Sequence, residues 1–190
     1  MNKIKLGDVL DIKRGMTLPG EFYSLEGHYI RLTLGNFNYP DAGWKENTSK
    51  KDLFYVGAIR REYILKKGDI ITPLTEQVPG LLGNTATIPE DNLYIQSGDI
   101  GLVKTDETKI NERFVYYLLS SKMVKKQLAA RSQQTKIRHT SPEAIKSCTA
   151  FIPNLGEQAE IAKILDNLNL KIENNNNINH NLSYQSPMVA

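Results

Sequence analysis

Apolar positions in the first part of the chain recur at short intervals and predict small elements. An apolar face at helical spacing predicts a short helix over residues 6–12, which ends at Arg14-Gly15. Residues 29–34 alternate apolar and polar side chains and predict a half-buried strand, with Arg31 and Thr33 on its outer face. Further short strands are expected between Gly- and Pro-containing turns, at residues 54–56, 63–65, 69–72, 85–88 and 98–103.

Helical spacing is more prominent after residue 110. Asn111 is expected to cap a helix that runs to about residue 130, because apolar side chains recur on one side and lysines lie on the other. Residues 131–140 are polar and basic and predict a loop. Residues 149–152 predict a strand that returns to the core.

The last part of the chain has the spacing of a coiled-coil seam. Four apolar residues follow one another at intervals of four, three and four: Ile161, Leu165, Leu168 and Ile172. Six of the eight residues in 174–181 are asparagine, so the helix is expected to fray or lose its partner there. A polar low-complexity tract and a register-setting role explain these asparagines equally well.

Together these elements predict the α+β fold class. The expected architecture is a globular domain over residues 1–153, with a curled, mostly antiparallel sheet plus helices. A long C-terminal coiled-coil helix over residues 154–190 is expected to follow it.

Composition narrows the class of protein. The chain has 190 residues, of which 40% are hydrophobic and 24% charged, as expected for one globular domain with an appended element. No window approaches 18 apolar residues and the first residues lack the pattern of a signal peptide, so we expect a cytoplasmic protein without a membrane partner. A single cysteine, Cys148, excludes an internal disulfide and a multi-cysteine zinc site.

Charge is distributed unevenly. The net charge is only +3, but residues 113–142 hold seven Lys or Arg side chains and no Asp or Glu. A solvated helix face is the usual explanation of such a run. The absence of any compensating acid favours an anionic partner instead.

Catalytic motifs are not found in the sequence. No phosphate-binding loop, dinucleotide-binding glycine pattern or adenine methyltransferase signature is present, so no catalytic residue, metal ligand or bound cofactor is expected. One alternative is a magnesium-dependent nuclease that uses Asp91, Glu107 and Lys109, although residues 106–109 also predict an exposed turn. A second alternative is an interaction module whose coiled coil is its only binding surface.

Binding chemistry remains, with side-chain types that bind phosphates and base edges, although a polar loop is usually only a loop and neither of the two loops is decisive alone. Phosphate contacts are expected from the basic helix and its end: Lys122, Lys125, Lys126 and Arg131. Contacts to base edges are expected from polar groups on two loops and one strand face: Arg14, Arg31, Thr75, Gln77, Gln133, Gln134, Lys136 and Arg138.

Several short segments, in order, resemble the specificity subunit of type I restriction-modification systems. They are Leu6-Gly7-Asp8, Tyr29-Ile30-Arg31, Lys66-Lys67-Gly68-Asp69, Tyr116-Tyr117-Leu118, Gln134-Thr135-Lys136-Ile137, and Glu157-Gln158 with Ile161-Ala162. Each is short, and their order and spacing make the resemblance specific. It covers nearly the whole chain.

The resemblance implies a non-catalytic protein with separate catalytic partners. It would bind one half of a bipartite double-stranded DNA target and direct a DNA adenine methyltransferase subunit, and in complete systems a restriction subunit, to it. S-adenosylmethionine would be bound by the methyltransferase subunit. Family members carry two recognition domains and two helices, whereas each element occurs once here.

That single copy predicts a homodimer through Ile161, Leu165, Leu168 and Ile172, reading two inverted half-sites. Two alternatives stay open: the seam packs on its own domain, or the chain is a truncated piece whose natural partner half is missing.

Overall fold

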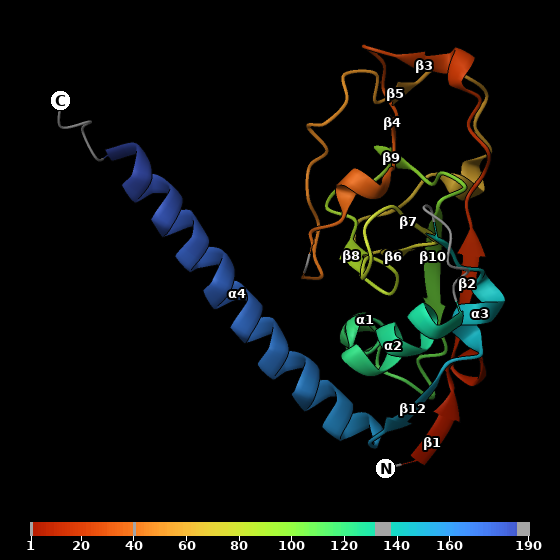
Figure 1. The fold of residues 1–190 in the computed structure, drawn as a ribbon, viewed down its shortest axis with the longest axis vertical. Coiled ribbons are helices and arrows are strands. Elements are labelled where there is room, and N and C mark those ends of the chain that lie inside the picture. The colour runs from red at the N-terminus through yellow and green to blue at the C-terminus, as the bar shows by residue number, and fades with distance from the viewer. Residues whose placement is uncertain (1, 40, 132–137, 186–190) are drawn as a thin grey trace.

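The computed structural model describes residues 2–39, 41–131 and 138–185. Within these residues, four small sheets and three short α-helices form the body of the molecule. One long helix, α4 (Leu155–Gln185), leads away from the body (Figure 1). The α+β class that the sequence predicts is confirmed.

A four-stranded antiparallel sheet lies at the centre. Its order is β2 (Leu10–Arg14), β10 (Ile100–Thr105), β6 (Ile70–Pro73) and β8 (Ala86–Thr87). Both faces of this sheet are buried, because alternating residues contribute to two separate apolar clusters. Ile12, Ile70 and Val103 pack with the helices, whereas Ile71, Ile100 and Leu102 pack with the second sheet.

The second sheet lies farther from α4 (Figure 1). Its order is β3 (Tyr23–Ser24), β5 (Phe54–Tyr55), β4 (Ile30–Arg31) and β9 (Tyr94–Ile95), and only β4 and β9 run parallel among these pairs. Strand β4 is shorter than predicted, because Thr33 caps a 3-10 helix, η3 (Leu34–Asn36), through a hydrogen bond from Gly35 N to Thr33 Oγ1 of 3.1 Å. The predicted outward orientation of Arg31 is wrong, since this residue is buried.

The predicted N-terminal helix is also wrong. A 3-10 helix, η1 (Leu6–Asp8), is followed directly by strand β2. Leu10 and Ile12 are buried while Asp11 and Lys13 are exposed, so the strand period of two applies from Leu10 onward. Two further 3-10 helices are η2 (Gly20–Phe22) and η4 (Arg61–Tyr63), the latter where a strand over 63–65 was expected.

The predicted helix after Asn111 begins as expected and is then interrupted. Asn111 Oδ1 accepts a hydrogen bond from Phe114 N of 2.9 Å and caps α1 (Glu112–Ser120). Ser121 has extended backbone angles and separates α1 from α2 (Lys122–Arg131). The helix is interrupted here because Ser121 Oγ accepts a hydrogen bond from Val124 N and so caps the second helix.

The remaining elements are short. Strand β1 (Asn2–Lys5) pairs antiparallel with β12 (Thr149–Ile152), the strand that the sequence predicts at these residues. Strand β7 (Thr75–Glu76) pairs with β11 (Arg138–His139). Helix α3 (Pro142–Lys146) was not predicted, although its Ser141 cap and first-turn Pro142 are recognisable signals.

Helix α4 is held at its start by buried polar contacts. The Gln158 side chain, 1% exposed, accepts from Asn111 N at 2.8 Å and donates to Pro153 O at 2.9 Å. Farther along, Asp166 Oδ1 accepts from Arg113 Nε and Tyr117 Oη, both at 2.6 Å. Burial, with the bond to Asp166, raises the pKa of Tyr117. Asn169 Nδ2 also donates to Tyr117 Oη at 3.2 Å. Farther along, α4 leads away from the body and continues as a helix through the asparagine-rich residues, where the sequence predicts fraying.

Gln158→Ala is expected to loosen α4, because it leaves the Asn111 N–H and the Pro153 carbonyl without their partner. Two buried groups without partners cost about 2 kcal/mol together, which corresponds to about 30-fold faster amide exchange in the first turns of α4. Hydrogen exchange measures this directly. Glu160→Ala, an exposed change on the same helix, is the control and should leave exchange unchanged.

No helix among the described residues is both long enough and apolar enough to span a membrane.

Candidate nucleic-acid interface

The two polar loops singled out in the sequence are joined at their bases. Strand β7 lies within the first loop, predicted at residues 72–77, and β11 forms the end of the second, predicted at residues 132–139. The pairing places Arg138 opposite Glu76 and His139 opposite Thr75. The fold therefore holds together two segments that lie about sixty residues apart in sequence. Gln133, Gln134 and Lys136 lie outside the described residues.

Glu76 is the centre of this junction and was not identified from the sequence. Its carboxylate is 2% exposed, and Oε2 accepts hydrogen bonds from Gly80 N at 2.9 Å and Leu82 N at 3.0 Å. Its Oε1 pairs with Arg138 Nη1 at 3.4 Å. One buried acid thus fixes the turn after β7 and the arginine on β11. The Pro79-Gly80 turn shortly after Glu76 was the available signal, because it folds backbone N–H groups back toward the carboxylate.

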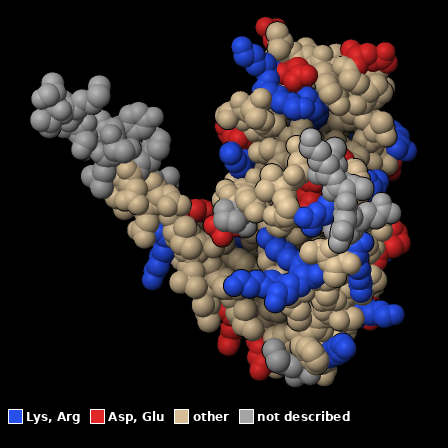
Figure 2. All heavy atoms as spheres, in the orientation of Figure 1, with Lys and Arg blue, Asp and Glu red and all other residues tan. Residues whose placement is uncertain are grey.

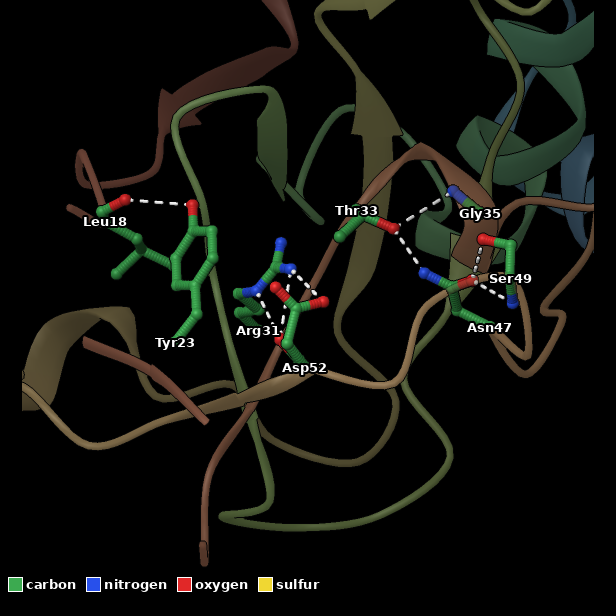
Figure 3. Close-up of polar contacts among 8 residues, drawn as sticks. All are labelled: Leu18, Tyr23, Arg31, Thr33, Gly35, Asn47, Ser49 and Asp52. Atoms are coloured by element: carbon green, nitrogen blue, oxygen red, sulfur yellow. Dashed lines mark hydrogen bonds and ion pairs between the residues drawn. The ribbon is translucent and has the colours of Figure 1, made fainter. Parts of the chain in front are cut away.

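Arg31 is engaged inside the protein (Figure 3). Its Nε and Nη2 donate to Asp52 O at 3.2 and 3.1 Å, and its guanidinium carbon lies 3.7 Å from the centre of the Tyr23 ring. Tyr23 Oη in turn donates to Leu18 O at 3.0 Å. Arg31 therefore ties three segments of the second sheet together, and in this arrangement its donors do not face solvent.

Thr75 is likewise occupied within the fold. This residue is 5% exposed, and its Oγ1 lies 2.7 Å from Asp99 Oδ1 and 3.2 Å from His139 Nδ1. The contact braces the β7 and β11 pair against the turn before β10. Thr75, like Arg31, is buried and supports the neighbouring surface segments through contacts inside the protein.

Three other residues assigned to base contacts are accessible to differing extents. Arg14 is exposed and donates to Gly98 O at 2.7 Å and Thr140 O at 3.2 Å, which links the end of β2 to the residue after β11. Gln77 is exposed immediately after β7. The Arg138 side chain is 28% exposed and held by Glu76.

The basic side chains of α2 divide into free and tethered groups. Lys122 and Lys126 are exposed, whereas Lys125 is half-buried and its Nζ donates to Asn84 Oδ1. Burial lowers the pKa of Lys125. Arg131 Nη1 donates to Ala144 O at 3.2 Å and to Ser147 Oγ, so it joins α2 to α3. Figure 2 shows basic side chains gathered on this face over α1 and α2.

Helix α4 exposes most of its predicted seam. Ile161, Leu168 and Ile172 are 36%, 50% and 57% exposed, whereas Leu165 is half-buried toward the body. Ile164, 59% exposed, belongs to the same stripe and was missed by the sequence analysis, although its spacing of three and four residues from its neighbours was available. The body contacts a different side of the helix, through Gln158 and Ala162.

Two of the three residues of the nuclease alternative, Asp91 and Lys109, have partners in the local structure. Asp91 Oδ1 accepts a hydrogen bond from Lys67 N at 2.9 Å. Lys109 Nζ pairs with Asp106 Oδ2 at 2.8 Å, in the exposed turn that the sequence also predicts. Within the described part of the chain, no three His, Cys, Asp or Glu side chains form a group that could hold a metal ion.

Comparison with known proteins identifies the family. No curated protein is a match. The S subunit of a Type-I restriction-modification system from M. genitalium is similar in structure, with a TM-score of 0.62 and 20% identity over 91% of this chain and 40% of that one. A chain from a study of complex assembly and conformational transition of the type I R-M system has a TM-score of 0.62 and 17% identity, over 97% of this chain and 42% of that one. The HsdS subunit from Thermoanaerobacter tengcongensis has a TM-score of 0.57 and 15% identity, over 90% of this chain and 38% of that one.

These likenesses establish the fold, and the chain spans about two fifths of the length of each solved subunit, from 38% to 42%. The family itself is established by sequence, because residues 1–184 match the family described as the Type I restriction modification DNA specificity domain. This chain therefore belongs to the type I restriction modification DNA specificity domain family.

Proposed function

We propose that the chain reads one half of a bipartite duplex DNA target and directs a separate methyltransferase to it. The family match over residues 1–184 carries this proposal. The junction of β7 and β11 supports it, because the pairing joins Thr75 and Glu76 to Arg138 and His139, with Gln77 directly after β7.

Base contacts are assigned to the accessible groups at this junction. Gln77, Arg138 and Arg14 lie on or next to it, and the loop between α2 and β11 adds Gln133, Gln134 and Lys136. Arg31 and Thr75 support the surface from within and are left out of the proposed readout. Phosphate contacts are assigned to Lys122 and Lys126, with Lys125 and Arg131 needing to leave their present partners to take part.

The family points to partners that supply the chemistry. A DNA adenine methyltransferase subunit would bind S-adenosylmethionine and transfer the methyl group, and a restriction subunit would cut DNA in a complete system. Such a complex would work in the cytoplasm, where the chromosome is accessible. The exposed stripe of α4 supports pairing with a second copy of this chain.

Binding of the purified chain to duplex DNA tests the proposal. The logarithm of the affinity should fall linearly with the logarithm of the salt concentration, with a slope of about −0.9 per phosphate neutralised. Lys122→Ala with Lys126→Ala should weaken binding to all sequences alike and reduce the slope by about 2. Fluorescence anisotropy with labelled duplexes measures both quantities.

Glu112→Ala and Glu160→Ala serve as controls, because both residues are exposed acids on neighbouring helices. Neither should weaken binding. A chain that binds no duplex at low salt, alone or with its methyltransferase, would favour the coiled-coil interaction module. Cleavage of plasmid by the pure chain with magnesium would favour the nuclease.

A further inference from the structure

A groove outside the loops described above collects basic side chains from distant parts of the chain. It has a volume of about 540 Å³ and lies among the end of β2, strand β10 and the segment around η4. Its lining includes two acids and five cations: Glu62, Asp69, Lys13, Arg14, Arg61, Lys66 and Lys104. These cations come from segments that lie far apart in the sequence, so the sequence alone does not reveal that they share one groove.

Both acids of the groove already have partners. Asp69 Oδ1 pairs with Lys104 Nζ at 2.9 Å, and its Oδ2 accepts from Lys66 N at 2.9 Å. Glu62 Oε1 pairs with Arg60 Nη1 at 3.4 Å, outside the lining. The acids therefore do not neutralise the other cations of the groove.

Four exposed cations remain without an ion pair in the described part of the chain. Lys13, Arg61 and Lys66 make none, and Arg14 donates only to the neutral carbonyls of Gly98 and Thr140. The nearby acid on the same strand, Asp11, is held by Lys146 at 2.9 Å. The five cations and two acids of the lining give this one concave surface a net formal charge of +3, as large as that of the whole chain. Like charges repel, so a bound anion would lower the electrostatic energy of such a cluster.

The position of the groove points to a polyanion that also meets the junction of β7 and β11. Arg14 lines the groove and also donates to Thr140 O, directly after β11. An exposed row of cations suits a chain of phosphates, whereas a single small anion is usually enclosed by buried donors. The same duplex that presents its bases to Gln77 and Arg138 can therefore lay its backbone along the groove.

We propose that Lys13, Arg61 and Lys66, which line the groove beside Arg14, form a second contact to the DNA phosphate backbone, separate from the lysines of α2. This inference rests on the proposed function and adds to it. Two chain segments contribute, the end of β2 and the residues around η4, and Arg14 connects this groove to the residue after β11. The contact adds affinity without sequence preference.

The test compares two triple variants that remove the same charge. Lys13→Ala with Arg61→Ala and Lys66→Ala removes three groove cations and keeps Arg14, which braces the fold. Lys3→Ala with Lys50→Ala and Lys171→Ala removes three exposed cations elsewhere. Binding of both variants to a labelled duplex of random sequence is measured across a range of salt concentrations.

The groove variant should bind at least about tenfold more weakly at moderate salt, and its salt slope should be smaller by about 2 to 3, whereas the control keeps most of the slope. Lys13→Gln with Arg61→Gln and Lys66→Gln, which retains polar side chains, should give the same result and guards against misfolding. Equal salt slopes for the groove and control variants, with normal binding by the unchanged chain, would show that the groove does not contact DNA phosphates. The proposed function would then still stand. Absence of binding by the unchanged chain, alone and with its methyltransferase, would overturn both.

Discussion

Glu76→Ala is expected to lower the free energy of unfolding by about 2–4 kcal/mol. The change leaves the N–H groups of Gly80 and Leu82 without an acceptor in a buried site and removes the partner of Arg138. Urea unfolding, followed by the fluorescence of Trp44, measures the loss. Trp44 is the single tryptophan of the chain and packs against Tyr94 in the second apolar cluster, so its emission reports the folded body.

Three further variants show how much of the stability loss comes from the backbone donors of Gly80 and Leu82 and how much from Arg138. Glu76→Gln keeps the shape and one acceptor oxygen and should cost less than Glu76→Ala. Arg138→Ala should also cost less, because the carboxylate keeps its two backbone donors. Glu26→Ala, an exposed acid, is the matched control and should stay within about 0.5 kcal/mol of the unchanged chain. A loss for Glu76→Ala no larger than for Glu26→Ala would mean that the carboxylate does not hold the two loops.

Local signals predicted those elements whose formation depends on neighbouring residues. The Asn111 cap, strand β12 and the start of α4 agree with the sequence because a capping side chain, an alternating run and a helical period are local features. The fold class and the family resemblance are confirmed as well. The family was recognisable because several short segments keep their order along nearly the whole chain.

Predictions failed where a pattern fitted two periods or depended on distant partners. Leu6, Val9 and Leu10 fit a helical face, but Leu10 and Ile12 also fit a strand, and pairing with β10 favours the strand. The helix after Asn111 was expected to be continuous, but Ser121 caps a second helix. Such choices are made by tertiary contacts, which a single sequence does not reveal.

The candidate site was predicted by residue type more accurately than by orientation. The β7 and β11 segments were named from their composition, and the fold brings their bases together. Arg31 was expected to face outward because of strand alternation, yet Asp52 and Tyr23 draw it inside. Of the groove cations only Arg14 was named from the sequence as a DNA contact, because the others come from two segments about fifty residues apart and a charge run along the chain does not reveal such a grouping.

Leu168→Asp with Ile172→Asp is expected to convert a dimer of this chain into a monomer. The two side chains are 50% and 57% exposed on the stripe of α4 that the body does not cover. Two such helices, each about 46 Å long at 1.5 Å per residue, would bury their stripes against one another in a closed two-fold pair. Sedimentation should then give twice 21.4 kDa for the unchanged chain and 21.4 kDa for the variant.

Leu170→Asp provides the matched control, because Leu170 is 56% exposed but lies two positions from both stripe residues, on another side of the helix. This change adds one carboxylate to the same part of the helix and should leave the dimer intact. A monomer at micromolar concentration for the unchanged chain would exclude the homodimer, and with it a target made of two inverted half-sites read by identical copies. Association that survives Leu168→Asp with Ile172→Asp would place the contact elsewhere on the molecule, because two carboxylates buried in an apolar seam without partners cost far more than the seam gains.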